Sequence, residues 1–128
     1  MHELSLAENV LAIVEQASHA QGFERVHTLR LSVPALAGVE VGALRFALET
    51  LAGGTPLEGA RIEIDEPPGR ARCEDCGREV DVLDRLAPCP LCGGTRLRVL
   101  GGTTMRVLEL WVPAAVDAVR QEGARRCA

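Results

Sequence analysis

Two closely spaced pairs of cysteines constrain the folding of this chain more than any other sequence feature. The pairs are Cys73-x-x-Cys76 and Cys89-x-x-Cys92, and a glycine follows the second cysteine of each. Each pair predicts a tight turn that directs two thiolates at one centre, and four thiolates match the tetrahedral coordination of Zn²⁺. Residues 69–101 contain few large apolar residues and need a metal to fold. The sequence therefore predicts a Cys₄ zinc-ribbon module.

Other uses of the four cysteines are less favoured. Iron can occupy such a site, but electron transfer of the rubredoxin type requires an aromatic core, and residues 69–101 contain no aromatic residue. A redox-active pair more often stands alone at the start of a helix. Disulfides suit secreted proteins, whereas this cysteine spacing and the absence of a signal-peptide pattern favour the cytoplasm. A zinc ion held by all four cysteines has no open ligand position, so the zinc is structural. The fifth cysteine, Cys127, is expected to be an exposed thiol in the tail.

Around the module, hydrophobic periodicity predicts an α+β fold. Apolar residues have helical spacing over residues 3–21 and 40–52. Alternating residues predict strands over 25–33, 60–65 and 107–112. We therefore expect two helices against a small three-stranded sheet, with the zinc module inserted between two of the strands. The expected buried face of the first helix consists of Leu4, Leu6, Ala7, Val10, Leu11, Ile13, Val14 and Ala17.

Proline and glycine clusters at 67–69 and 101–102 mark the borders of the module. The expected domains are an α+β domain of residues 1–68 and 102–113, the zinc-binding module of residues 69–101, and a tail of residues 114–128. Val116 and Val119 have the spacing of a short helix in this tail.

Charge and composition exclude several functions. Fourteen basic and 18 acidic residues give a net charge of −4, which disfavours nucleic-acid binding. Three aromatic residues, Phe23, Phe46 and Trp111, are too few for a base-stacking platform. No apolar run approaches the roughly 18 residues of a membrane span. The sequence offers neither a nucleophile–base set nor a phosphate-binding glycine loop, so we expect no enzyme.

The first three residues, Met1-His2-Glu3, can form a chelate. A free α-amine, the amide nitrogen of His2 and its imidazole can bind one metal through fused five- and six-membered rings, as suits planar coordination of Ni²⁺ or Cu²⁺. A histidine at position 2 is more often merely solvated. His19 and His27 are expected to have no metal role.

The chain as a whole resembles the HypA/HybF family of nickel metallochaperones. The resemblance begins at Met1-His2-Glu3-Leu4-Ser5 and covers residues 1–112, including both cysteine pairs. Further segments that carry it are Leu36-Ala37-Gly38-Val39, Leu44-Arg45-Phe46-Ala47-Leu48-Glu49, Gly59-Ala60-Arg61-Ile62-Glu63-Ile64 and Leu108-Glu109-Leu110. The chain departs from the family at Val80, where an aromatic residue is common, at residues 101–105, and in its longer tail.

The resemblance implies a nickel site and a zinc site. His2 would be the essential nickel ligand, assisted by the Met1 amine and Glu3, and Cys73, Cys76, Cys89 and Cys92 would hold structural zinc. Nickel would be a transient cargo delivered for maturation of [NiFe]-hydrogenase. The implied partners are the GTPase HypB and the hydrogenase large subunit, with urease maturation proteins in some members. We expect a monomer or a weak homodimer.

The alternative is a zinc-ribbon module that binds a protein or a nucleic acid, in which residues 1–3 have no role. From Arg70 to Arg98 the module has six arginines and five acidic residues, so four thiolates and one Zn²⁺ make it net negative. That charge disfavours the nucleic-acid version.

Overall fold

The computed structural model describes residues 2–113 and the backbone of residues 124–127, which form two compact units. The first unit comprises residues 2–31, 40–64, 107–113 and 124–127. The second unit comprises residues 32–39 and 65–106. Each unit has a sheet of its own.

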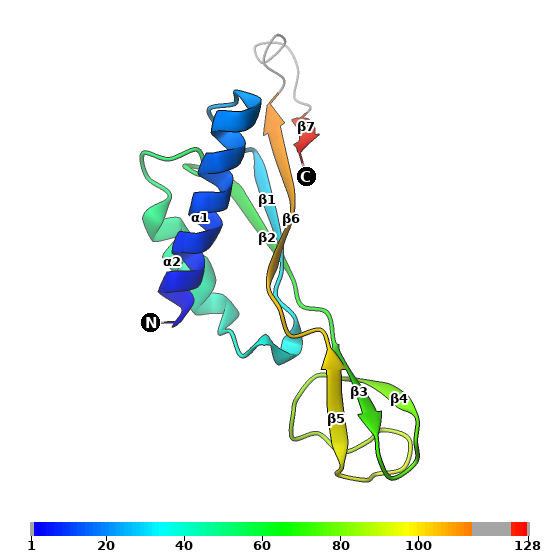
Figure 1. Cartoon of the computed structure of the whole chain (residues 1–128). Coiled ribbons are helices and arrows are strands. Elements are labelled where there is room, and N and C mark those ends of the chain that lie inside the picture. Colours follow the sequence, from blue (N-terminus) through cyan, green and yellow to red (C-terminus); the bar gives the residue numbers. More distant parts are fainter. Residues whose placement is uncertain (1, 114–123, 128) are drawn as a thin grey trace. The chain divides into compact units, whose positions relative to one another are not determined.

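The first unit is a four-stranded sheet with both helices on one of its faces (Figure 1). The helices are α1 (His2–Gln21) and α2 (Val41–Leu51). The strands, in the spatial order β2-β1-β6-β7, are β2 (Arg61–Asp65), β1 (Thr28–Ser32), β6 (Arg106–Pro113) and β7 (Ala124–Cys127). The two predicted helices and the three predicted strands are confirmed.

Strand β7 is a fourth strand that the sequence did not predict. It pairs antiparallel with β6, with Leu110 opposite Cys127 and Pro113 opposite Ala124. The helix expected around Val116 and Val119 lies outside the described residues.

The core of the first unit lies between the helices and the sheet. Leu29 and Leu31 of β1 are fully buried, as their alternation predicts. Only part of the face predicted for α1 is buried, namely Ala7, Val10 and Val14. The prediction is wrong for Leu4 and Ile13, which are 39% and 47% exposed. These side chains flank the buried stripe, and a single helix against one layer covers only a narrow stripe.

Helix α1 ends as predicted at Gly22, whose φ of 74° lies in the left-handed region that favours glycine. Its N–H donates to the carbonyl of Ser18 at 2.8 Å. Among the described residues, no helix has the length and apolarity that crossing a membrane requires.

The second unit contains a three-stranded antiparallel sheet in the order β4-β3-β5. The strands are β3 (Gly69–Cys73), β4 (Glu79–Val82) and β5 (Leu97–Gly101). Its buried cluster is small and includes two of the predicted metal ligands; its members are Leu36, Ala71, Cys73, Val80, Val82 and Cys89. So small a core matches the expectation that this part of the chain needs a metal.

Residues 32–39 belong to this second unit, although the sequence analysis assigned them to the first domain. The segment contains η1 (Ala35–Ala37), a 3₁₀ turn whose Leu36 is only 3% exposed. The Ala35 N–H donates to the carbonyl of Pro67, and Arg85 donates to the carbonyl of Leu36. The unit is therefore completed by a segment that precedes it by some thirty residues.

Gly69, the first residue of β3, has no room for a side chain. A Cβ at this position would overlap the Cγ and Cδ1 atoms of Leu36. Since Leu36 is held in the buried cluster, we expect Gly69→Ala to destabilise the second unit by about 1–3 kcal/mol. Gly101→Ala is the matched control, because a Cβ at Gly101 meets nothing within 4 Å. Urea unfolding monitored by amide resonances of the second unit measures both. Equal stability of the two variants would contradict this packing.

Candidate metal centres

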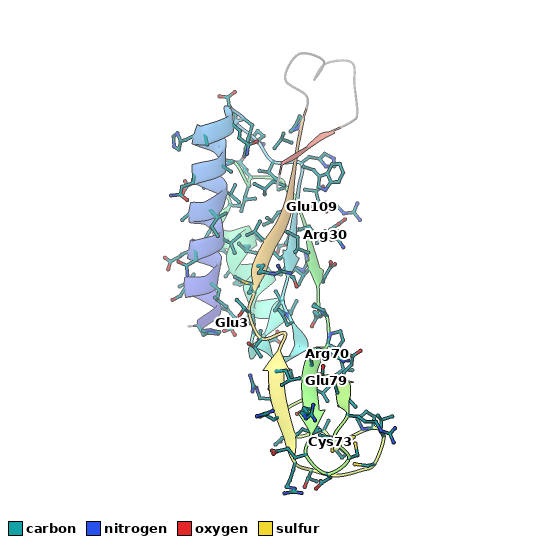
Figure 2. All side chains as sticks on the ribbon, turned by 45° about the vertical axis from the view of Figure 1, so that its right-hand side comes forward. Glu3, Arg30, Arg70, Cys73, Glu79 and Glu109 are labelled. Carbon is teal, nitrogen blue, oxygen red and sulfur yellow. The ribbon has the colours of Figure 1, made fainter. Side chains whose placement is uncertain are left out.

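The four predicted zinc ligands come together at one end of the second unit. Cys73 ends β3 (Figure 2), Cys76 follows in the next turn, and Cys89 and Cys92 lie in a second turn before β5. All four sulfur atoms lie within 4.8 Å of one another. The Cys73 and Cys92 sulfurs are 3.5 Å apart and those of Cys76 and Cys89 3.9 Å. A tetrahedral zinc with Zn–S bonds of about 2.3 Å places sulfurs about 3.8 Å apart, so the set fits Zn²⁺.

Backbone amides surround these sulfurs in two similar turns. Cys73 Sγ accepts from the N–H of Cys76, Cys89 Sγ from that of Leu91, and Cys92 Sγ from that of Gly94, each at 3.4 Å. The glycines after the second cysteines, Gly77 and Gly93, have φ values of 75° and 76°, as the tight turns require. N–H groups directed at sulfur stabilise thiolates, which are the form that binds metal.

The electrostatics of the cluster also favour a cation. Burial opposes ionisation of Cys89, but bonds from the backbone of Cys92 and Leu91 outweigh it and lower the pKa of Cys89 to about 7. The Gly94 N–H favours the thiolate of Cys92, yet the neighbouring sulfurs, Cys73 foremost, raise the pKa of Cys92 to about 12. Four negative charges so close together repel one another, and a divalent cation relieves that repulsion. All four cysteines are free thiols, which does not support the disulfide alternative.

One contact that supports the cysteine turns was not predicted from the sequence. Arg96 donates to Asp75 Oδ1 through Nε and Nη2, at 2.9 and 2.7 Å. The Glu74 N–H also donates to the carbonyl of Arg96 at 2.8 Å. The first cysteine turn is thereby tied to the segment before β5. Because Asp75 and Arg96 are 21 residues apart, no local pattern signals the pair.

Two of the candidate nickel ligands, His2 and Glu3, lie at the start of α1, which begins at His2. The side chain of His2 is 60% exposed, and its Nδ1 lies 3.7 Å from Oε2 of Glu3. Glu3 is less exposed, at 22%, and stands in the first turn of the helix (Figure 2). Met1 lies outside the described residues. The structure therefore brings together His2 and Glu3 of the predicted set.

Glu3 also ties the two helices together. Its Oε2 accepts a hydrogen bond from the backbone N–H of Glu40 at 3.1 Å. Glu40 is itself the N-cap of α2, because its Oε1 accepts from the N–H of Ala43 at 3.3 Å. Glu40 was not among the predicted site residues, although an acidic residue directly before a predicted helix was the available signal.

This contact makes Glu3 a stronger acid. The pKa of Glu3 lies below its ordinary value of 4.5. The largest cause is the hydrogen bond from the backbone of Glu40, followed by that from the N–H of Glu3 itself, and His2 contributes less. The contact is therefore formed above pH 4.5 and is lost as the pH falls through the lowered pKa.

We expect the Glu40 amide proton resonance to titrate with a midpoint below pH 4.5, since its acceptor is the Glu3 carboxylate. The measurement is a pH series of amide spectra. Glu3→Gln, which has no titrating carboxyl at this position, is expected to abolish the titration. A midpoint at or above 4.5, or a titration unchanged in Glu3→Gln, would contradict the contact.

The other two histidines, His19 and His27, do not belong to a group of three or more potential metal ligands among the described residues. His19 is exposed on α1, and His27 Nδ1 lies 2.8 Å from the Thr28 hydroxyl. Within the described residues, the four cysteines form the one group of three or more potential metal ligands.

Comparisons with known proteins identify relatives of this chain over residues 1–112. Residues 1–112 match the family model described as "Hydrogenase/urease nickel incorporation, metallochaperone, hypA". Over 112 residues the chain is 53% identical to a hydrogenase maturation factor HypA of Cupriavidus necator, covering 88% of this chain and 94% of the relative. Identity to a factor of the same description from Cereibacter sphaeroides is 50%, covering 88% and 99%.

Solved structures show the same fold. The solution structure of the Ni metallochaperone HypA from Helicobacter pylori aligns with a TM-score of 0.58 at 17% identity, over 84% of this chain and 94% of that one. A second solution structure, of a HypA protein, aligns with a TM-score of 0.59 at 20% identity, over 86% and 94%.

Proposed function

Because this chain belongs to the HypA family of hydrogenase and urease nickel-incorporation metallochaperones, we propose that it binds Ni²⁺ at its N-terminus and delivers it for [NiFe]-hydrogenase maturation. The observation that carries the proposal is the exposed imidazole of His2 in the first turn of α1, beside the Glu3 carboxylate. A partner protein must be able to reach a site that holds cargo, and the exposed end of a helix is accessible to such a partner.

The backbone at this end suits a chelate. The first N–H groups of an α-helix have no acceptor within the helix. The amide nitrogen of His2 can therefore lose its proton to Ni²⁺ without breaking a helical hydrogen bond. Together with the Met1 amine and the His2 imidazole, it offers the planar nitrogen set that Ni²⁺ accepts.

Glu3 serves chiefly as a positioning residue in this proposal. Its Oε2 is hydrogen-bonded to Glu40, which fixes the first turn of α1 relative to α2. The carboxylate also lies near His2, where its negative charge favours a bound cation.

The second metal is structural zinc, held by Cys73, Cys76, Cys89 and Cys92. Zinc in this closed thiolate site supplies folding energy and has no open position for a substrate. The protein is accordingly a carrier and no enzyme. Its proposed partners are the HypB GTPase and the hydrogenase large subunit, with urease maturation proteins as additional partners. It would act in the cytoplasm as a monomer or weak homodimer.

A nickel titration of the zinc-loaded chain tests whether the two sites are separate. We expect one Ni²⁺ to bind per chain with no release of Zn²⁺, because the nitrogen set and the sulfur set share no residue. Equilibrium dialysis with elemental analysis of both metals measures this. Zinc released in proportion to the nickel bound would place nickel at the sulfurs and overturn the proposal.

A further inference from the structure

A groove of about 310 Å³ opens between the two helices of the first unit. Figure 1 shows these helices side by side on one face of the sheet. The groove is lined by Glu3, Leu4, Ala43, Phe46, Ala47 and Thr50.

The walls of this groove are apolar and exposed. Phe46 of α2 is 70% exposed and Leu4 of α1 is 39% exposed. The hydroxyl of Thr50 donates to the carbonyl of Phe46 at 2.9 Å, so its one donor is used within its own helix. An apolar side chain placed here would bury the phenyl ring without displacing a needed polar contact.

The helices around the groove are acidic. Arg45 is the one basic residue other than histidine on α1 and α2, and its Nη1 donates to the carbonyl of Ile62 at 2.6 Å. The acidic residues of the two helices and the α2 cap are Glu3, Glu8, Glu15, Glu40 and Glu49. This charge favours an occupant with basic residues around its apolar contact. It disfavours a second copy of this chain, because two acidic pairs of helices repel each other.

The groove also adjoins the proposed nickel site. Glu3 lines the groove, and its Oε2 lies 3.7 Å from His2 Nδ1. A protein seated on Phe46 and Leu4 would therefore stand beside the metal ligands at the start of α1.

We propose that this groove is the docking site for the protein that exchanges nickel with this chain, and that this protein inserts a bulky apolar side chain flanked by lysine and arginine. The inference rests on the nickel-carrier function proposed above. Docking excludes water from around the phenyl ring, while the basic residues meet the acidic helices.

The test uses the chain loaded with zinc but not with nickel. Isothermal titration measures its binding to the HypB GTPase. We expect Phe46→Ala to weaken binding about tenfold or more, and binding of the unaltered chain to weaken as salt rises. Ile13→Ala is the matched control, since Ile13 is 47% exposed on α1 but does not line the groove. It should change the affinity less than twofold. Both variants should retain zinc and bind one nickel, because neither side chain is buried.

The docking site would be overturned if the GTPase did not bind the unaltered chain, or if it bound Phe46→Ala equally well. A Phe46→Ala variant that loses self-association while binding the GTPase normally would assign the groove to a second copy and also overturn the proposal. His2→Ala separates docking from cargo. It should dock normally while binding nickel roughly a hundredfold or more weakly. If it binds nickel normally, the nickel site is wrong, while the Phe46 comparison still decides the docking site.

Discussion

Replacing Cys76 with alanine is expected to remove zinc from the chain and unfold the second unit. Four-thiolate zinc supplies an apparent free energy of about 10–16 kcal/mol near neutral pH in small zinc modules. The buried cluster of this unit is too small to replace it, and two of its members, Cys73 and Cys89, are themselves ligands. The first unit should keep its helices, since its core of Val10, Leu29 and similar residues lies elsewhere.

Elemental analysis and amide spectra of Cys76→Ala measure this outcome. Cys127→Ala is the control, because it removes a thiol that belongs to neither pair, and it should leave one zinc per chain. Full zinc occupancy of Cys76→Ala with an intact second unit would exclude the Cys₄ site.

His2→Ala is expected to lower nickel affinity by roughly a hundredfold or more, which corresponds to about 2.8 kcal/mol. The substitution removes one ring of the chelate. Because the side chain is 60% exposed, the change in stability should stay within about 0.5 kcal/mol. His19→Ala is the matched control on the same helix and should bind nickel normally. Equal affinities of the two variants would contradict a role for His2.

Local patterns were sufficient to predict both helices and three strands of the first unit. The alternation around Leu29 and Leu31 and the helical spacing of Leu44 and Leu48 identified elements whose burial is set by their own residues. The cysteine spacing likewise predicted a cluster whose four sulfurs the structure brings together.

Contacts between distant segments could not be predicted in this way. Leu36 lies in a three-residue turn, too short for any periodicity, and its burial depends on the second unit. The contact between Glu3 and Glu40 spans 37 residues. The exposure of Leu4 and Ile13 depends on how much of the surface of α1 is covered by the sheet and by α2. The helical spacing of apolar residues does not predict that coverage.

Nickel chelation by the Met1 amine together with His2 is tested most directly by adding two residues ahead of Met1. The extension turns the amine into a peptide nitrogen and leaves His2 and the rest of the chain intact. It should barely change stability, because the side chain of the neighbouring His2 is 60% exposed and chain ends contribute little to stability. The measurement is the absorption spectrum and affinity of the nickel complex with and without the extension. Loss of the planar, diamagnetic nickel signal, with zinc and melting temperature unchanged, is the predicted result. An extended chain that keeps the original spectrum and affinity would place nickel elsewhere.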